Sequence, residues 1–331
     1  MKKTTPFSFL KLKLGPLALL FAMVFGAVSC DTADEVSPDQ GLQTTLQDIP
    51  AELKKLQASS TTANSEMYPT FNTLLVALGS SGLSPTVAME ELTLFAPTDA
   101  AFEKLGLNPS NVASVPNLKE ILLYHVVAGQ VLSTDLKNGF VPTLNGAAVE
   151  IMLKNGVMVN TATVQLADIR ALNGVIHVID EVLMPPMYSL SEIAYGNESD
   201  YSLLIEGVKL AGLEQMLSEG GPYTIFAPTN AALQSALMTM GYASLNQVPV
   251  EFIREIVLYH VVKGRVYSSD LVNGSNVPTL SGDTFRVNLS DLTLIDTQNR
   301  KAKLEPELLN VQATDGVVHV IHGVLLPNLE D

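Results

Sequence analysis

Apolar residues in this chain follow a helical spacing and then an extended pattern, and both occur in the same order twice. In the first copy, one helix face is expected to carry Leu118 and the residues three, four and seven positions after it, which are Ile121, Leu122 and His125. The Val-Val pair and the glycine within 126–129 then predict a short strand that ends in a turn, because β-branched residues favour extended backbone and glycine favours turns. Residues 253–264 repeat the whole succession.

The most similar stretch of the two copies is nine residues long. Leu123–Val131 reads Leu-Tyr-His-Val-Val-Ala-Gly-Gln-Val, and Leu258–Val266 keeps seven of these nine residues. The copies are separated by the length of a whole domain, which is too long for a solenoid repeat. The chain is therefore expected to hold two homologous domains in tandem, at 46–187 and 188–331.

Other blocks recur in the same order. An amphipathic helix is expected at 71–78 and again at 201–208. Phe-Ala-Pro-Thr predicts a strand that stops at proline, followed by a helix whose N-cap is Thr98 in the first copy and Thr229 in the second. Asp99 would add favourable charge at the start of that helix, whereas the neutral Asn that replaces it in the second copy would not.

Short strands fill the rest of each copy. They are expected at 149–153, 157–160, 163–166, 284–289 and 293–295, and each copy closes with one more, at 173–179 and 315–321. Before the first copy, residues 50–56 favour a short helix with proline at its first position, which either belongs to the first domain or only caps it.

The Tyr-His pair within the repeated stretch is the first candidate site. Both histidines fall on the apolar helix face, so the main interpretation is a buried, hydrogen-bonded side chain that supports the fold. A role in partner binding is the alternative. The candidate partner-binding or structural residues are Tyr124, His125, Tyr259 and His260.

These paired blocks resemble the fasciclin domain family. The resemblance depends on Phe-Ala-Pro-Thr-Asp-Ala-Ala-Phe at 95–102, Tyr-His-Val-Val-x-Gly at 124–129 and Asn-Gly-Val-Ile-His-Val-Ile-Asp at 173–180, all of which recur in order in the second half. It implies an α+β fold with two tandem fasciclin-like domains, each a β-sheet wedge flanked by helices. It also implies extracellular adhesion, and in some animal members the Tyr-His pair takes part in receptor recognition.

Composition narrows the possible partners. The chain has 47% hydrophobic residues, so it is not a disordered protein, and its single Cys excludes a disulfide scaffold. A net charge of −15 argues against nucleic acid and against anionic polysaccharide, because both repel an acidic surface. The expected partner is an extracellular protein or a neutral polysaccharide, although the chain has no Trp for ring stacking.

The N-terminus predicts lipid attachment. Four lysines precede an apolar run at 14–25, and small residues lead to Cys30. The pattern predicts a lipoprotein signal peptide at 1–29, a lipid-carrying Cys30 and a flexible polar tether at 30–45. The alternatives are an uncleaved membrane anchor or an ordinary secretory cut that leaves a free thiol. The expected location is a bacterial cell envelope, on the outer membrane and facing outward.

No catalytic motif is present in the sequence. Serine-hydrolase, zinc-protease, phosphate-loop and calcium-loop patterns are all absent, so we expect no enzyme activity, no cofactor and no metal site. The main hypothesis is a lipid-anchored adhesion or binding protein that uses both domains. The alternative is a surface component of a nutrient-uptake system that captures a small ligand or a glycan.

Overall fold

The computed structural model describes residues 46–60, 69–154 and 156–328. The predicted signal peptide, Cys30 and the tether at 30–45 lie outside these residues. The described residues belong to one compact unit, Thr45–Asp331. We call residues 46–187 the first repeat and residues 188–328 the second repeat.

In the first repeat, helices precede most of the strands. The helices, including one 3₁₀ helix (η1), are α1 (Ile49–Ser60), α2 (Asn72–Ser80), α3 (Ser84–Met89), α4 (Asp99–Glu103), η1 (Val112–Ser114) and α5 (Leu118–Tyr124). The strands are β1 (Leu92–Pro97), β2 (Val126–Ala128), β3 (Gly139–Pro142), β4 (Ala148–Leu153), β5 (Val157–Val159), β6 (Ala162–Ala171) and β7 (Gly174–Ile179).

The second repeat follows the same order with small additions. Its helices, including three 3₁₀ helices, are α6 (Leu190–Gly196), α7 (Glu198–Leu210), α8 (Glu214–Glu219), α9 (Asn230–Met240), η2 (Leu245–Gln247), α10 (Val250–Tyr259), η3 (Ser268–Asp270) and η4 (Pro306–Leu308). Its strands are β8 (Tyr223–Pro228), β9 (Val261–Lys263), β10 (Asn276–Pro278), β11 (Thr284–Asn288), β12 (Thr293–Ile295), β13 (Lys301–Leu304), β14 (Val311–Ala313) and β15 (Gly316–His322).

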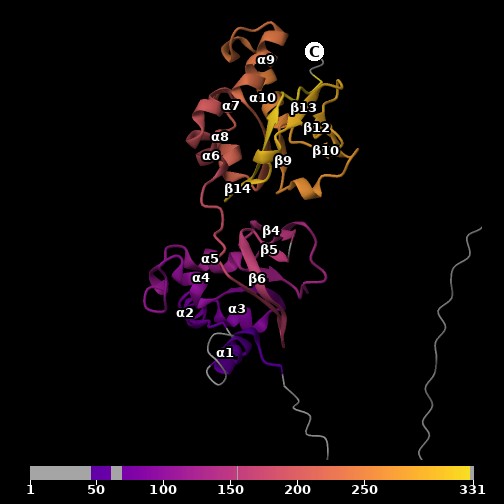
Figure 1. The fold of residues 1–331 in the computed structure, drawn as a ribbon. Coiled ribbons are helices and arrows are strands. Elements are labelled where there is room, and N and C mark those ends of the chain that lie inside the picture. Colours follow the sequence, from indigo (N-terminus) through magenta and orange to yellow (C-terminus); the bar gives the residue numbers. More distant parts are fainter. Residues whose placement is uncertain (1–45, 61–68, 155, 329–331) are drawn as a thin grey trace, which may run out of the picture. The chain divides into compact units, whose positions relative to one another are not determined.

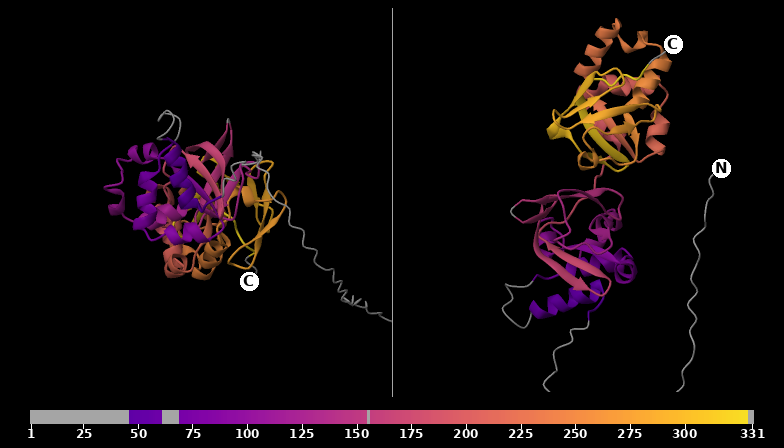
Figure 2. Two further views of the ribbon diagram at one scale, coloured as in Figure 1. Left: turned by 90° about the horizontal axis from the view of Figure 1, so that it is seen from below. Right: turned by 90° about the vertical axis from the view of Figure 1, so that its right-hand side faces the viewer.

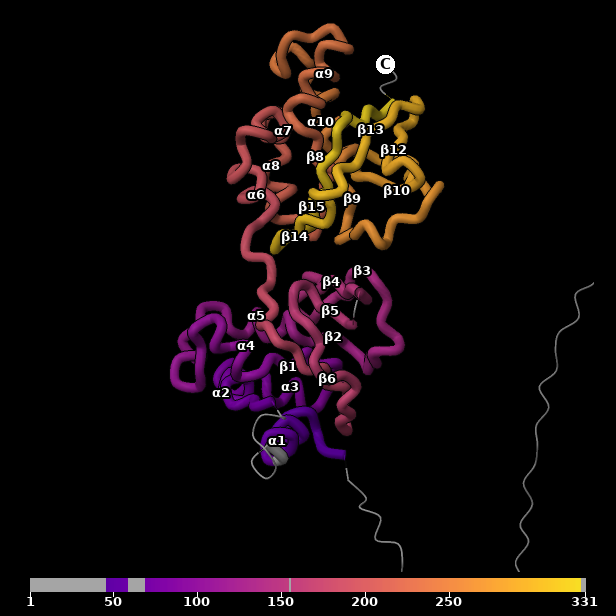
Figure 3. The backbone as a smooth tube through the Cα atoms, in the orientation of Figure 1, coloured from indigo at the N-terminus to yellow at the C-terminus, as the bar shows by residue number. Residues whose placement is uncertain are grey.

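Each repeat closes its sheet by returning its last strand to its first. The strand order is β2-β1-β7-β6-β5-β4-β3 in the first repeat and β10-β11-β12-β13-β15-β8-β9 in the second, where β14 also pairs with β15. The parallel pairs are β1 with β7 and β8 with β15, and the second of these can be followed in Figure 3. Gly174 lies opposite Leu92, and Gly316 lies opposite Tyr223, so the two repeats share one register.

Helices and strands separate within each repeat. In the second repeat, α6, α7 and α8 gather on one side and β10, β12 and β13 lie on the other, an arrangement that persists in the turned views (Figures 1 and 2). The central strands β1 and β7 are buried along their whole length, because their side chains enter two apolar clusters. The helix-side cluster includes Leu94 and Ile176, and the second cluster, which also takes in side chains of β4 and β5, includes Phe95 and Ile179. The predicted α+β fold, with a sheet flanked by helices in each repeat, is confirmed.

The N-terminal helix belongs to the first repeat. It is longer than predicted, and its side chains Ile49 and Leu53 are completely buried in the helix-side cluster with β1 and β7. Strand β6 is also longer than the predicted 163–166. Its residue Asp168 adopts a left-handed conformation, with φ of 60°, within the second of two register shifts, so a bulge lets the strand continue to Ala171.

The predicted helix caps are confirmed, and Asp99 has an additional contact. Thr98 and Thr229 accept hydrogen bonds from backbone N–H groups three residues later, at 3.1 and 3.3 Å. The Asp99 carboxylate accepts a 2.8 Å hydrogen bond from the backbone N–H of Thr73 in α2. Asn230, its neutral counterpart, accepts from the backbone N–H of Leu203 in α7, so this position joins two helices in both repeats.

The two repeats touch through a small set of contacts. The rings of Phe140 and Tyr267 stack with centroids 4.4 Å apart. The side-chain amide of Gln312 accepts from the backbone N–H of Ala148 at 3.0 Å and donates to its carbonyl at 2.8 Å. This pair of hydrogen bonds satisfies both backbone groups of the first residue of β4.

Candidate functional site

Each histidine of the repeated stretch is fixed between two backbone groups. His125 has no exposed surface, and its Nδ1 lies 2.8 Å from the carbonyl oxygen of Ile121. Its Nε2 lies 2.9 Å from the backbone nitrogen of Leu183. Because the carbonyl can only accept and the N–H can only donate, the ring is neutral and its proton is on Nδ1. The imidazole thereby ties the end of α5 to the segment after β7.

His260 repeats this arrangement in the second repeat. Nδ1 lies 2.7 Å from the carbonyl oxygen of Ile256, and Nε2 lies 3.0 Å from the backbone nitrogen of Leu325. Burial removes solvent from both rings and lowers the pKa of His125 and of His260 to about 4, although the hydrogen bond to the helix carbonyl opposes the shift. Both histidines are therefore neutral at physiological pH.

The neighbouring tyrosines join a helix to a strand in each repeat, α5 to β4 in the first and α10 to β11 in the second. The Tyr124 hydroxyl donates to the carbonyl oxygen of Ala148 at 2.8 Å, and the Tyr259 hydroxyl donates to that of Thr284 at the same distance. Their rings are at most 2% exposed, and burial raises the pKa of Tyr259 to about 12. At most 2% of the surface of any of the four residues is exposed, and their polar atoms are bonded to backbone groups, so the contacts favour the structural interpretation over partner binding.

The histidines of the closing strands are also internally bonded. His177 Nε2 donates to the carbonyl oxygen of Val131 at 2.9 Å, and His319 Nε2 donates to that of Val266 at 2.8 Å. Their Nδ1 atoms accept backbone N–H groups from Asp168 and Asn310. Within residues 46–60, 69–154 and 156–328, no group of three His, Cys, Asp or Glu side chains could hold a metal ion, and no helix is long and apolar enough to cross a membrane.

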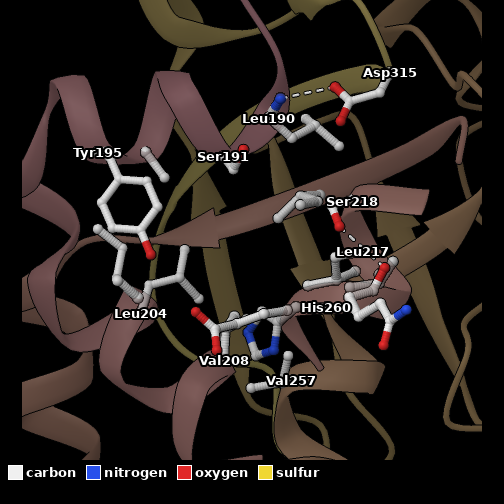
Figure 4. Close-up of a pocket in the computed structure, with 16 residues that line it drawn as sticks. Leu190, Ser191, Tyr195, Leu204, Val208, Leu217, Ser218, Val257, His260 and Asp315 are labelled. Atoms are coloured by element: carbon white, nitrogen blue, oxygen red, sulfur yellow. Dashed lines mark hydrogen bonds between the residues drawn. The ribbon is translucent and has the colours of Figure 1, made fainter. Parts of the chain in front are cut away.

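A cavity that sequence reasoning did not find lies beside His260. It has a volume of about 310 Å³, is open on one side, and is bordered by α6, α7, α8, the end of α10 and the adjacent strands of the second repeat. Its lining residues are mostly apolar: Leu190, Ser191, Ala194, Tyr195, Leu204, Ile205, Val208, Glu214, Gln215, Leu217, Ser218, Ile225, Val257, His260, Val261 and Asp315. Figure 4 shows Tyr195 and Leu217 on opposite sides of the space, with His260 between them at its base.

The first repeat shows which residues would occupy the equivalent space. The backbone N–H of Ile49, at the start of α1, donates to Asn173 Oδ1 at 3.0 Å. The backbone N–H of Leu190, at the start of α6, donates to Asp315 Oδ1 at 2.7 Å. Asn173 and Asp315 precede corresponding strands, so Ile49 and Leu190 are equivalent positions, and the two helices can be aligned from there.

The alignment explains the cavity. Four residues into each helix, the completely buried Leu53 of the first repeat corresponds to Ala194 of the second. Helix α6 also ends after seven residues, whereas α1 continues for twelve. Because the first repeat closes the same space with ordinary side chains, the fold does not impose the cavity.

Two further leucines of the first repeat are smaller in the second. Leu78 and Leu122 are 1% and 2% exposed and correspond to Val208 and Val257, which line the cavity. Val208 is only half-buried, whereas its counterpart Leu78 is fully buried. The second repeat therefore has less side-chain volume on three sides of the same space.

The fold and these contacts define a protein of two repeated α+β domains, each with a barrel-like sheet, helices on one side and a buried Tyr-His pair. The model of the fasciclin domain matches residues 69–185 and 199–327. The chain belongs to the fasciclin domain family, and it carries two such domains in tandem.

Relatives include bacterial and animal proteins. The Synechocystis protein sll1483 is 42% identical over 124 residues, which cover 36% of this chain and 69% of that protein. The transforming growth factor-beta-induced protein ig-h3 of Sus scrofa is 31% identical over 245 residues, or 71% of this chain, and this chain spans about a third (35%) of its length. A solved domain pair from the insect cell adhesion molecule fasciclin I is 20% identical, with a TM-score of 0.38, and covers 77% of this chain and 95% of that one.

Proposed function

We propose that this protein is a lipid-anchored adhesion or binding protein of a bacterial cell envelope, held to the membrane at Cys30. The observation that carries the proposal is the tandem pair of fasciclin domains, because proteins with these domains are extracellular or surface-associated and include a named cell adhesion molecule. The buried, fully bonded histidines support a binding scaffold rather than a catalytic one.

The partner we propose is an extracellular protein or a neutral polysaccharide. The chain has 34 acidic and 19 basic residues, so an anionic polysaccharide or nucleic acid would be repelled. A second candidate function is capture of a small ligand or glycan for a nutrient-uptake system. The cavity beside His260 favours this candidate, because small molecules bind in concave, mostly apolar sites.

An array of glycans and extracellular proteins, probed with residues 31–331, tests the main proposal. This fragment retains the compact unit Thr45–Asp331. We expect saturable binding to a neutral glycan or a protein, with no binding to heparin. Failure to bind any arrayed partner, together with tight binding of a small metabolite, would overturn adhesion in favour of ligand capture.

The proposed lipid anchor predicts that Cys30→Ala releases the protein from membranes. Acyl chains on Cys30 would supply the membrane affinity, since each buried CH₂ group contributes about 0.8 kcal/mol. Fractionation of cells into soluble and membrane pools, followed by immunoblotting, measures the change. We expect the wild type in the membrane pool and Cys30→Ala in the soluble pool or still carrying its signal peptide.

The matched control for this experiment is Ala27→Leu, because lipoprotein signal peptides more often carry Leu three positions before the lipid-carrying cysteine. We expect this variant to stay in the membrane pool after signal-peptide removal. Membrane association of a processed Cys30→Ala protein would contradict the anchor.

A further inference from the structure

We propose that the second repeat binds a small neutral apolar molecule in the cavity between α6, α7 and α8, and that the first repeat does not. This inference goes beyond the proposed adhesion, because it assigns a separate small-molecule site to one of the two domains. The side chains that separate the repeats are Ala194 against Leu53 and Val208 against Leu78.

The size of the cavity sets the size of the ligand. An engineered apolar cavity of about 150 Å³ binds benzene. The cavity here, about 310 Å³, is twice as large and therefore accommodates about twelve nonhydrogen atoms. A medium-length aliphatic chain or a pair of fused rings has this size. Most of the wall is Leu, Ile, Val and Ala, which gives such a ligand apolar contact on several sides.

The charges around the cavity select against an anion. Glu214 and Asp315 are among the lining residues, and no Lys or Arg lines the cavity. Lys209 of α7 lies beside the cavity rather than in its wall: its side chain is exposed, and its ammonium nitrogen is 5.2 Å from the centroid of the ring of Tyr195. A carboxylate in the apolar interior would lose its hydration near Glu214 and Asp315 without a cation in the wall, which is costly. A fatty acid is therefore a poorer ligand than the corresponding alcohol.

Hydroxyl groups near the edge of the cavity suit a ligand with one polar end. Ser191 and Tyr195 come from α6, and Ser218 comes from α8 on the opposite side (Figure 4). All three residues are exposed, whereas Leu190 and Leu217 are buried. The ring of His260 adds an apolar surface at the base, because both of its nitrogens are already bonded to backbone groups. The apolar part of the ligand would lie inward, and its hydroxyl would face these serines and the tyrosine.

Isothermal titration calorimetry with decan-1-ol and with decanoate tests the proposal on residues 31–331. The two probes share a chain length and differ in charge. We expect decan-1-ol to bind saturably at one site per chain, and decanoate to bind at least tenfold more weakly. Saturable binding would be absent if the alcohol only adsorbed to exposed surface.

Filling variants connect the binding to this cavity. Ala194→Leu installs the residue of the first repeat and should weaken decan-1-ol binding at least tenfold while raising the melting temperature. Val208→Leu fills the space from α7 and provides a second test if the first variant does not fold. Ala231→Leu makes the same chemical change at an exposed position of α9 and should leave binding unchanged.

Four results would overturn the proposal, and three of them concern decan-1-ol and decanoate directly. They are no saturable binding of decan-1-ol, unchanged binding in every filling variant that circular dichroism shows to be folded, and decanoate binding as tight as that of the alcohol. Binding at two sites per chain would also contradict it, since the buried Leu53 and Leu78 occupy the corresponding place in the first repeat. Partner binding on the glycan and protein array is measured separately, so failure here leaves the adhesion proposal intact.

Discussion

As the pH falls from 6.5 to about 4, each repeat is expected to lose about 3 kcal/mol of its free energy of unfolding through one buried histidine. His125 and His260 hold their place only as neutral rings, because Nε2 must accept a backbone N–H. Protonation would place two donors face to face in a site without water. The acid form therefore favours the unfolded chain.

Stability falls with falling pH because the pKa of each histidine is lower in the folded chain than in the unfolded chain. The folded pKa is about 4 and the unfolded value is 6.5, so between them the unfolded chain binds more protons than the folded one. The stabilisation by each histidine is fully present above pH 6.5 and is lost as the pH falls towards 4. Burial also lowers the pKa of His177 and of His319, which adds to the loss in the same direction.

Urea unfolding at a series of pH values between 4.5 and 7 measures this effect. The slope of stability against pH gives the number of protons taken up on unfolding, and we expect at least one per repeat at the acid end. His125→Gln should reduce that uptake by one. Gly79→Ala, which changes no titratable group, is the control and should leave the slope unchanged. A stability independent of pH over this range would contradict the assigned neutral rings.

Gly174→Ala and Gly316→Ala are each expected to destabilise their repeat by about 3 kcal/mol or more. A Cβ at Gly174 would collide with the carbonyl oxygen of Leu92 on the adjacent parallel strand and approach Ile49 Cδ1 to 2.9 Å. At Gly316 the collision is with the carbonyl oxygen of Tyr223, and Leu190 Cδ1 lies 2.6 Å away. The clash involves backbone, so rotation of a side chain cannot relieve it.

Thermal unfolding of the two variants tests this prediction. Gly79→Ala is the matched control, because a Cβ there meets nothing within 4 Å and its backbone φ is not positive. It lies in α2, where alanine should stabilise the helix by about 0.5–1 kcal/mol. A Gly174→Ala protein as stable as the wild type would show that the helix, strand and glycine are not packed as closely as the structure has them.

Local patterns were sufficient to predict much of this fold. The spacing of Leu118, Ile121 and Leu122 predicted a helix with a buried face, and Phe-Ala-Pro-Thr predicted a strand, a stop and a capped helix. Both depend on neighbours within a few residues, where periodicity and capping act. Burial of the repeated histidines followed in the same way, because they continue the apolar face of the helix.

Contacts between distant segments could not be predicted in this way. The Asp99 carboxylate caps a helix 26 residues earlier in the chain, and only the packed structure shows which helix it reaches. The bulge at Asp168 depends on a local left-handed conformation that an alternating pattern does not specify.

The cavity was missed for a related reason. Its clearest signal is Ala194 in place of Leu53, but these residues lie in helices that precede the recognisable repeated blocks. They align only through the equivalent hydrogen bonds to Asn173 and Asp315. With that alignment, which the structure supplies, the shorter helix α6 and the smaller side chains account for the underfilled core.

We infer that the residues shared by both repeats support the fold rather than contact a partner. Urea unfolding of His125→Ala and His260→Ala at pH 7 tests this inference. Each change leaves two buried backbone groups without a partner, Ile121 and Leu183 in the first repeat, and creates a cavity. We predict a loss of about 3 kcal/mol or more in the free energy of unfolding of the altered repeat. Unchanged stability in either variant, with partner binding lost, would contradict the claim.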